Sequence, residues 1–170
     1  LTMVCENDNT HTVSVTGVVV TPSTTAADCV NAGSTVYTAT VSFENGIAAG
    51  LAFGAEDGSH YWVFNVDREA NLVKLLYFTV VDGKTSAVEL LTDYFIGNDK
   101  MTESEKRLVN PKVATIDKVQ LKVIITPEAD GVYAEFYADN IRRFGIDNTI
   151  ELNSLELLPE GVSYNGGSIG

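Results

Sequence analysis

Apolar and polar side chains alternate in short runs between residues 35 and 138, which is the pattern of half-buried β-strands. The clearest run is the segment YWVFNVD at Tyr61–Asp67. Successive side chains of a strand point to opposite faces, so this run has two different sides. One side is wholly apolar: Trp62, Phe64 and Val66. The other side runs from an aromatic ring to a carboxylate: Tyr61, Val63, Asn65 and Asp67. We expect the first side to join the core and the second to present a polar surface to something outside.

Asx-Gly pairs separate several of these runs and predict tight turns between antiparallel neighbours, because these residues tolerate positive φ. The pairs are Asn45-Gly46, Asp57-Gly58, Asp82-Gly83 and Asp130-Gly131. The strands that they join are expected at Thr35–Glu44, Ile47–Ala55, His60–Asp67, Leu72–Val81, Thr85–Thr92, Val119–Pro127 and Val132–Ala138. Shorter strands are expected at Val13–Val20, Ile141–Phe144 and Ile150–Leu158, and a polar arm without strand pattern at Leu1–Thr12.

One helix is expected in the long connection after Phe95. Thr102 precedes Glu105 by three residues, which is the spacing of a capping box. Lys106 and Arg107 follow as a basic last turn, and Pro111 is expected to end the helix.

These elements predict an all-β protein, a two-sheet antiparallel β-sandwich of jelly-roll (concanavalin-like) type with one short helix in a crossover loop. No strand–helix–strand alternation is visible, which argues against Rossmann-like and barrel enzymes. We expect a single domain, with residues 1–34 forming an N-terminal arm with the first strand and residues 35–170 forming the sandwich. The glycine-rich end suggests that the final strand is missing from the chain or supplied by the arm.

Composition narrows the class of protein. Of 170 residues, 45% are hydrophobic, which is enough for a substantial core. The net charge of −12 repels phosphate backbones and anionic lipid, so we expect no nucleic acid and no membrane partner. No apolar run approaches the roughly 20 residues of a membrane span. The acidic surface is common in secreted proteins, and we expect an extracellular or cell-surface piece of a larger chain.

The cysteines and the acidic loops do not form a recognisable metal-binding motif in the sequence. Cys5 and Cys29 both lie in the weakly patterned N-terminal part, where a disulfide and two free thiols are equally compatible with the sequence. No CxxC motif or Cys/His cluster suggests zinc. Glu56-Asp57 and Asp139-Asn140 could supply oxygens to a structural calcium, but no DxDxDG loop occurs. We therefore expect no cofactor.

Catalytic patterns are weak. The histidines are His11, in the arm, and His60, at the start of a strand beside Ser59, and neighbouring strand residues face opposite ways. Asp67 alone among the acidic residues ends an aromatic strand, and no second acid opposes it in sequence. We expect a protein that is not an enzyme. Asp67 either contacts a ligand or pairs with Arg68 in a polar turn, and both interpretations stay open.

The aromatic strand has the chemistry of sugar recognition. Sandwich modules stack a ring beneath the C–H face of a sugar and bind its hydroxyls with planar polar groups. The candidate carbohydrate-binding residues are Glu56, Asp57, Tyr61, Asn65, Asp67 and Arg68. Tyr61 is the stacking ring, Asn65 and Asp67 bind hydroxyls, and Arg68 adds a charge-assisted bond or orients Asp67. Of Tyr77 and Phe78, one must face outward.

The same stretch resembles the family 66 carbohydrate-binding modules appended to levanases and other glycoside hydrolase family 32 enzymes. The matching motifs are AGLxFxA at Ala49–Ala55, an aromatic strand ending in N-V-D at Tyr61–Asp67, and VKLxxF within Leu72–Phe78. The resemblance extends more weakly over residues 36–170. It implies a jelly-roll sandwich, no catalysis, and recognition of a terminal fructose of levan or inulin. The segment Tyr37–Val41 carries threonines where such modules often carry acids, which leaves another glycan as an alternative.

The sequence thus predicts a non-catalytic carbohydrate-binding module that targets a covalently linked glycosidase to fructan. The alternative is a structural or adhesive β-sandwich domain of a large extracellular surface protein, with no sugar site.

Overall fold

The computed structural model describes the backbone of residues 2–5, 10–12, 15–16, 19–20, 34–43, 47–55, 59–98, 100–145 and 149–166. Side chains are described from residue 34 onward within these ranges, apart from residues 110 and 111.

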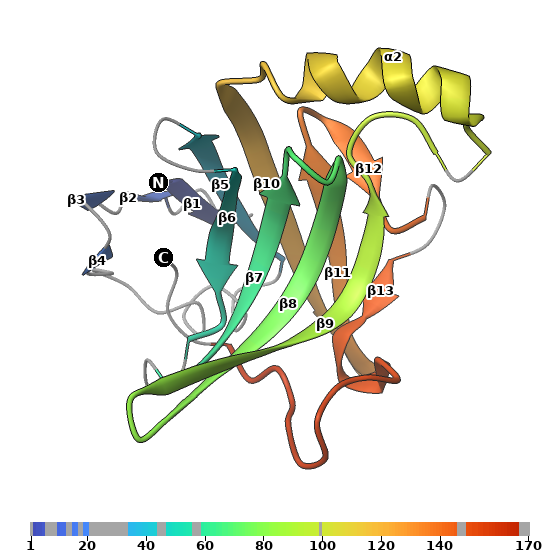
Figure 1. Ribbon diagram of the computed structural model, residues 1–170. Coiled ribbons are helices and arrows are strands. Elements are labelled where there is room, and N and C mark those ends of the chain that lie inside the picture. Colours follow the sequence, from blue (N-terminus) through green and yellow to red (C-terminus); the bar gives the residue numbers. More distant parts are fainter. Residues whose placement is uncertain are drawn as a thin grey trace.

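Two antiparallel sheets pack face to face (Figure 1). The smaller sheet is a four-stranded meander: β6 (Ala48–Phe53), β7 (His60–Asp67), β8 (Leu72–Val81) and β9 (Lys84–Tyr94). The larger sheet has the order β12 (Ile141–Arg143), β11 (Gly131–Ala138), β10 (Lys118–Glu128), β5 (Thr35–Ser42), β1 (Thr2–Cys5) and β2 (Thr10–Thr12), with β13 (Ile150–Glu151) also paired to β11. A separate pair joins β3 (Val15–Thr16) and β4 (Val19–Val20). The all-β sandwich is confirmed, and its jelly-roll type stays a prediction.

The core lies where alternation places it. Trp62, Phe64 and Val66 of β7 are 2%, 0% and 0% exposed. From the facing sheet, β10 and β11 contribute every second residue to the same core. Phe53 stands at its centre, within 6.1 to 6.4 Å of four other aromatic rings. Burial of these rings is the main stabilising contribution, at roughly 25 cal/mol per Å² of apolar surface.

Three of the four predicted hairpins are confirmed, namely β6–β7, β8–β9 and β10–β11. Asp82 and Gly83 have φ of 51° and 72°, which is the type I′ geometry that matches strand twist. In the β10–β11 hairpin, Glu128 pairs with Gly131, so the turn residues are Ala129 and Asp130, one position earlier than predicted.

The hairpin predicted at Asn45-Gly46 is wrong. The strand before it, β5, pairs with β1 and β10, whereas the strand after it, β6, pairs with β7. The chain therefore crosses from one sheet to the other here, and the turn residues themselves lie outside the described residues. A local turn signal predicts that the chain reverses, but it does not select the strand with which β5 pairs. Here β5 pairs with β10 along its whole length, and this pairing determines its sheet.

The helix α2 (Glu103–Val113) begins as predicted but ends later. The Glu105 amide donates to the Thr102 hydroxyl at 3.3 Å, and the Thr102 amide donates to the Glu105 carboxylate at 2.7 Å. This capping box lowers the Glu105 pKa, chiefly through the Thr102 amide. Pro111 lies within the helix rather than after it, and Lys112 stands in the last turn. Val113 is fully buried, and its packing holds that last turn in place.

Two other expectations are corrected. The segment expected to be an arm without strand pattern contains β1, which adds a strand beside β5. The strand predicted at Ile150–Leu158 ends at Glu151 and gives way to the 3-10 helix η1 (Leu152–Ser154). Within the described residues, no helix has the length and apolarity needed to cross a membrane.

Candidate functional site

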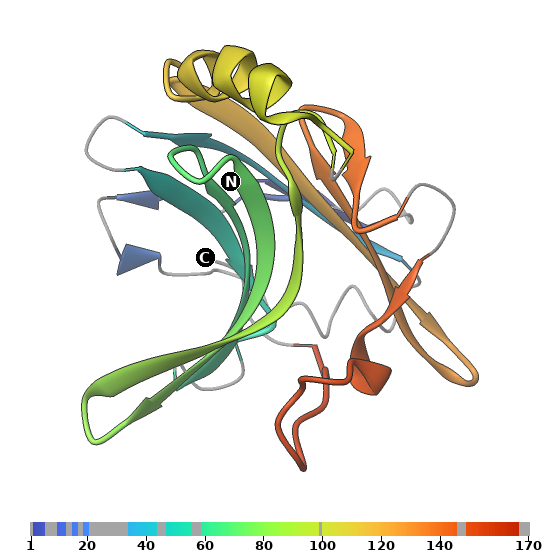
Figure 2. The ribbon, with the colours of Figure 1, turned by 45° about the vertical axis from the view of Figure 1, so that its right-hand side comes forward.

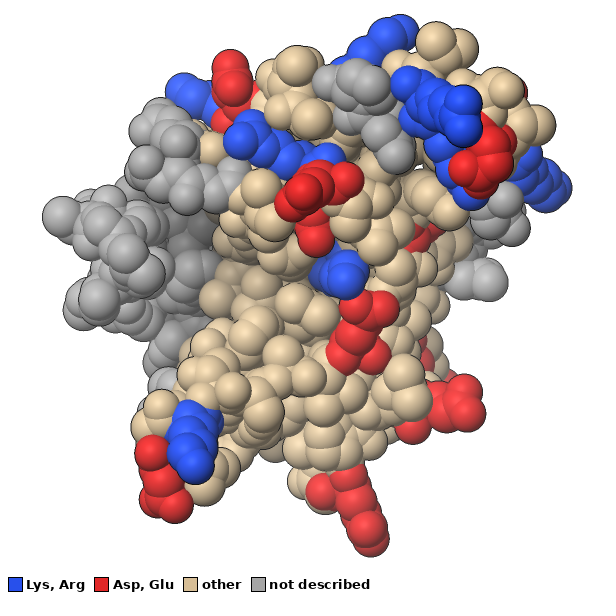
Figure 3. All heavy atoms as spheres, viewed as in Figure 1, with Lys and Arg blue, Asp and Glu red and all other residues tan. Residues whose placement is uncertain are grey.

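The side of β7 opposite the core carries three of the sequence-predicted site residues, Tyr61, Asn65 and Asp67, all half-buried. The small sheet bows toward the larger one, so its outer face is concave (Figure 2). The surface over β6–β9 carries few charged side chains (Figure 3). We call the outward side of β6–β9 the concave face.

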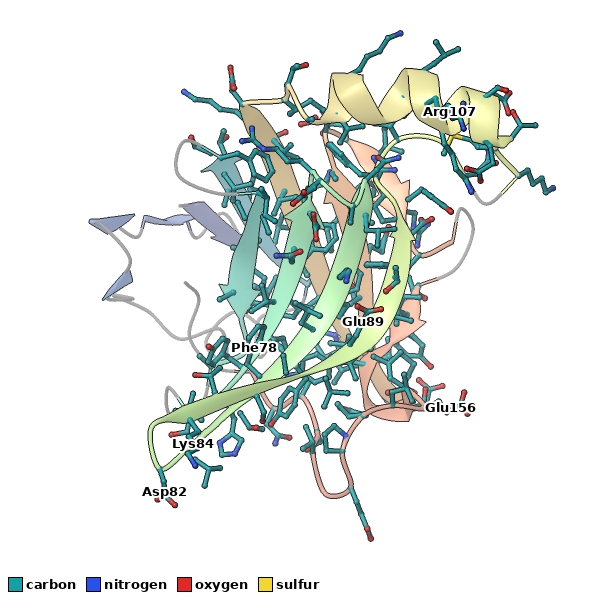
Figure 4. All side chains as sticks on the ribbon, viewed as in Figure 1. Phe78, Asp82, Lys84, Glu89, Arg107 and Glu156 are labelled. Atoms are coloured by element: carbon teal, nitrogen blue, oxygen red, sulfur yellow. The ribbon has the colours of Figure 1, made fainter. Side chains whose placement is uncertain are left out.

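An aromatic pair stands on this face. Tyr61 of β7 is directly opposite Phe78 of β8 in the strand register. Their ring planes are parallel to within 2°, with centroids 5.2 Å apart. Phe78 is half-buried on the concave face (Figure 4), whereas Tyr77 is 5% exposed in the core, so the expectation that one of the two faces outward is confirmed.

The strands on both sides of this pair carry small residues. On β9 the cross-strand partner of Phe78 is Ala87. On β6 the outward positions are Ala48, Gly50 and Ala52, which pair with Asp67, Asn65 and Val63. A Cβ on Gly50 would lie 2.8 Å from the Val63 side chain, so the strand can pass this close only with glycine. Ala87 therefore leaves one side of the Phe78 ring without a long neighbour, while the small residues of β6 flank the polar end of the face.

Polar groups continue the face beyond the rings. Asn65 is directly opposite Lys74, whose Nζ lies 2.8 Å from Oε2 of Glu89. The Thr92 hydroxyl donates to Oε1 of the same carboxylate at 2.5 Å. The bond from Lys74, followed by that from Thr92, lowers the Glu89 pKa, so this carboxylate is ionised at neutral pH. An amide, an ammonium and a carboxylate thus lie on the same face as the aromatic pair, further along the strands. Figure 4 labels Phe78 and Glu89 on neighbouring strands.

Asp67 and Arg68 are engaged in the fold. Oδ1 of Asp67 accepts a hydrogen bond from the Ala70 amide at 2.9 Å, which closes the turn between β7 and β8. The Arg68 guanidinium donates to the carbonyls of Ile116 and Phe43 at 2.9 and 3.3 Å, and lies 5.1 Å from the centroid of the Phe43 ring. Arg68 therefore braces the end of the sandwich, and its contacts go there rather than to Asp67.

The remaining candidate residues are not placed on this face by the part of the chain that the structure describes. Glu56 and Asp57 lie outside the described residues. Asp139 and Asn140, considered for calcium, have φ of 49° and 64° and form the tight turn between β11 and β12. Among described residues, no group of three metal-ligating side chains comes together.

The outer face of the larger sheet is different in kind. Its charged and aromatic groups bind one another: the Tyr137 hydroxyl donates to Glu135 at 2.5 Å, Arg142 lies 3.3 Å from the same carboxylate, and the Lys122 Nζ lies 4.2 Å from the centroid of the Tyr137 ring. Lys74, Glu89 and Thr92 contact one another in the same way on the concave face, so the stacked pair of rings is what distinguishes that face.

Sequence reasoning missed Lys74, Glu89 and Thr92, and did not choose Phe78 over Tyr77. The two-residue turn at Asp82-Gly83 fixes the register that places Phe78 opposite Ala87, so the pairing of these two residues could be predicted from the sequence. A register shift between Leu75 and Leu76 then moves β9 by one residue, and this irregularity brings Lys74 opposite Thr92. No local sequence signal marks it.

No family model matches the chain, and no curated protein or solved structure matches it either. Function is therefore inferred from the arrangement of residues on the concave face.

Proposed function

We propose that this chain is a non-catalytic carbohydrate-binding module that binds a glycan on its concave face. The observation that carries the proposal is the parallel pair of Tyr61 and Phe78 rings, half-exposed and with the small residue Ala87 opposite Phe78. Part of the apolar surface of these two rings is exposed to water, whereas it would be buried if the rings lay in the core. Sugar C–H faces restore that burial when they stack on the rings.

The surrounding polar groups supply the other half of sugar recognition. Asn65 offers an amide donor and acceptor, and the Lys74–Glu89 pair offers charged hydrogen-bond partners for hydroxyls. On a shallow face, the cost of removing water from the sugar hydroxyls offsets most of the free energy gained from the contacts. The dissociation constant for a single binding site is therefore roughly millimolar to micromolar. Several repeats of a polymer raise the effective affinity.

Fructan is the glycan we propose. The three motifs that resemble family 66 modules lie on β6, β7 and β8, which are neighbours in one sheet. The proposal therefore includes levan or inulin as the partner, an attached glycosidase in the parent protein, and an extracellular location.

A second candidate is a structural or adhesive β-sandwich domain without a sugar site. The contacts of Asp67 and Arg68 favour it, because two of the polar groups expected to bind hydroxyls instead hold the fold together.

Isothermal titration with levan and inulin tests the proposal, using the whole chain and the variants Tyr61→Ala and Phe78→Ala. We expect heat of binding with at least one fructan, and a loss of roughly 5-fold or more in affinity for each variant, because stacking on one ring contributes about 1–3 kcal/mol. The melting temperature should change little, since both side chains are half-buried.

Tyr133→Ala is the matched control, because Tyr133 is a half-buried tyrosine on the outward side of the larger sheet. It should bind like the unaltered chain. Absence of heat with every fructan would overturn the fructan proposal. If other glycans also gave no heat of binding, the alternative of a structural domain without a sugar site would be favoured.

A further inference from the structure

A pocket of about 230 Å³ opens at one end of the sandwich, away from the concave face. Its lining residues come from the start of β7, the adjoining part of β8 and residues 161–165 near the C-terminus. Figure 1 shows how this C-terminal segment crosses the end of the molecule. The residues that line it are Gly54, His60, Trp62, Tyr77, Gly161, Val162, Ser163 and Asn165.

The inner end of this pocket is closed and aromatic. Trp62 and Tyr77 are 2% and 5% exposed, with ring centroids 5.4 Å apart in an edge-on arrangement. Gly54 lies beside them with φ of 63°, and a Cβ there would lie 2.7 Å from the Tyr164 ring and 2.9 Å from Trp62. Only glycine fits against these two rings, so the chain packs closely at this edge of the pocket.

The outer wall is polar and held in place. Ser163 and Asn165 are exposed and bond to each other, with Nδ2 of Asn165 donating to Oγ of Ser163 at 3.0 Å. Between them, the buried Tyr164 anchors the segment, since its amide donates to Oδ1 of Asn153 at 2.7 Å and its hydroxyl lies 3.3 Å from that of Tyr37. The wall is therefore positioned before any ligand arrives.

The chemistry of the lining defines the ligand. The small exposed parts of the two rings suit C–H groups, and a hydroxyl and an amide suit ligand hydroxyls. Among the described residues that line it, none is a carboxylate, Lys or Arg. A volume of about 230 Å³ suits one sugar ring.

We infer that this pocket is a second sugar site, which holds one neutral sugar ring independently of the concave face. The inference rests on the proposed function for the class of ligand, but its residues are different. Ser163 and Asn165 would bind hydroxyls, while the small exposed parts of Trp62 and Tyr77 would contact C–H groups of the sugar.

Trp62 gives a direct readout, because it is the chain's one tryptophan and lines the pocket. The whole chain is titrated with D-fructose, D-glucose, D-galactose and N-acetylglucosamine while tryptophan emission is recorded. We expect a saturable change with at least one sugar. The double variant Ser163→Ala/Asn165→Ala should weaken it roughly 5- to 30-fold, which corresponds to losing one or two neutral hydrogen bonds.

Two controls separate this site from the concave face. Tyr61→Ala should keep the tryptophan response to monosaccharide even where it loses polymer binding, and Ser104→Ala, an exposed serine in α2, should change neither. If the concave face fails the fructan titration, the response of Trp62 is still informative on its own.

The inference is overturned if no sugar changes Trp62 emission, if adenosine does so but no sugar does, or if the double variant responds like the unaltered chain. Should that variant fail to fold, NMR of the unaltered chain decides. Sugar-dependent shifts at His60, Gly54 and Gly161 support the site, and their absence overturns it.

Discussion

At the scale of single residues, two tyrosines in the core couple the stability of the protein to pH. Tyr37 of β5 and Tyr164 of the C-terminal segment are 0% and 3% exposed, and their hydroxyls lie 3.3 Å apart. Burial raises the pKa of Tyr164 to about 12 and raises that of Tyr37 further, where the neighbouring hydroxyl adds to the effect. Both therefore stay neutral in the folded protein well above the pH at which free tyrosine ionises.

This pair predicts loss of stability in alkali. Below the unfolded pKa of about 10, both states are protonated and the full free energy of unfolding is present. As pH rises from 10 toward 12, the unfolded state loses protons that the folded state keeps. The titration of Tyr164 alone therefore lowers the free energy of unfolding by about 3 kcal/mol. Urea unfolding followed across this window measures the decline.

The double variant Tyr37→Phe/Tyr164→Phe removes both titrations while keeping the rings. We expect its free energy of unfolding to fall less steeply above pH 10 than that of the unaltered chain. Equal slopes for the two proteins would contradict the assignment of these pKa shifts to the buried pair.

At the scale of elements, the turn between β7 and β8 depends on Asn71. This residue is 1% exposed with φ of 59°, in the left-handed region. Its side chain donates to the Ile96 carbonyl and accepts from the Ile96 amide, both at 3.0 Å, and its own carbonyl accepts from the Phe95 amide at 3.0 Å. It thereby attaches the β7–β8 turn to the segment that leads from β9 to α2.

Asn71→Ala should lower the free energy of unfolding by about 2–4 kcal/mol, because it removes two hydrogen bonds and places alanine in the left-handed region. Asn71→Gly loses the same bonds but tolerates the backbone, so its loss should be smaller by about 1 kcal/mol. Denaturant unfolding of both variants checks the order. Alanine and glycine variants of equal stability would show that the backbone conformation is not part of the effect.

Individual strands were largely predictable from sequence because burial in a sandwich imposes a period of two. Trp62, Phe64 and Val66 lie in the core as alternation requires. The predictions that were wrong depend on contacts between segments far apart in the sequence. Asn45-Gly46 resembles a hairpin turn, yet the strands around it lie in different sheets, since the pairing of β5 is settled by β10, which is far along the chain.

The candidate site was predictable only in part for the same reason. The sequence places Tyr61 and Asn65 on an outward side, but the partners that complete the face depend on register with β8 and β9. Arg68 illustrates the limit. It follows Asp67 directly in sequence, yet its guanidinium reaches the carbonyls of Ile116 and Phe43, residues that only the tertiary fold brings to it.

At the scale of the whole molecule, the two sheets have outer faces of opposite character. The larger sheet pairs its charged and aromatic groups internally, as the contacts of Glu135 with Tyr137 and Arg142 show. The smaller sheet is concave, largely uncharged and carries the parallel rings of Tyr61 and Phe78 (Figure 2, Figure 3). Twist and coiling of the sheet produce this curvature, and they depend on all four strands together.

The asymmetry gives the proposed module one binding direction. A glycan bound on the concave face approaches from one side only, while the β8–β9 hairpin, with Asp82 and Lys84 at its tip, projects past the body beside that face (Figure 4). The larger sheet, extended by β1 and β2 of the N-terminal region, lies on the far side of the core. We propose that residues 1–34 act as an arm added to a sandwich formed by residues 35–170.

The most direct test of glycan binding on the concave face is NMR mapping of methyl and aromatic signals during titration with short levan fragments. We expect saturable shifts for Tyr61, Val63, Leu76 and Phe78, all on the concave face, and none for Ile124 or Tyr133 on the outer face of the larger sheet. Shifts confined to the larger sheet, or no shifts at all, would contradict the proposed site.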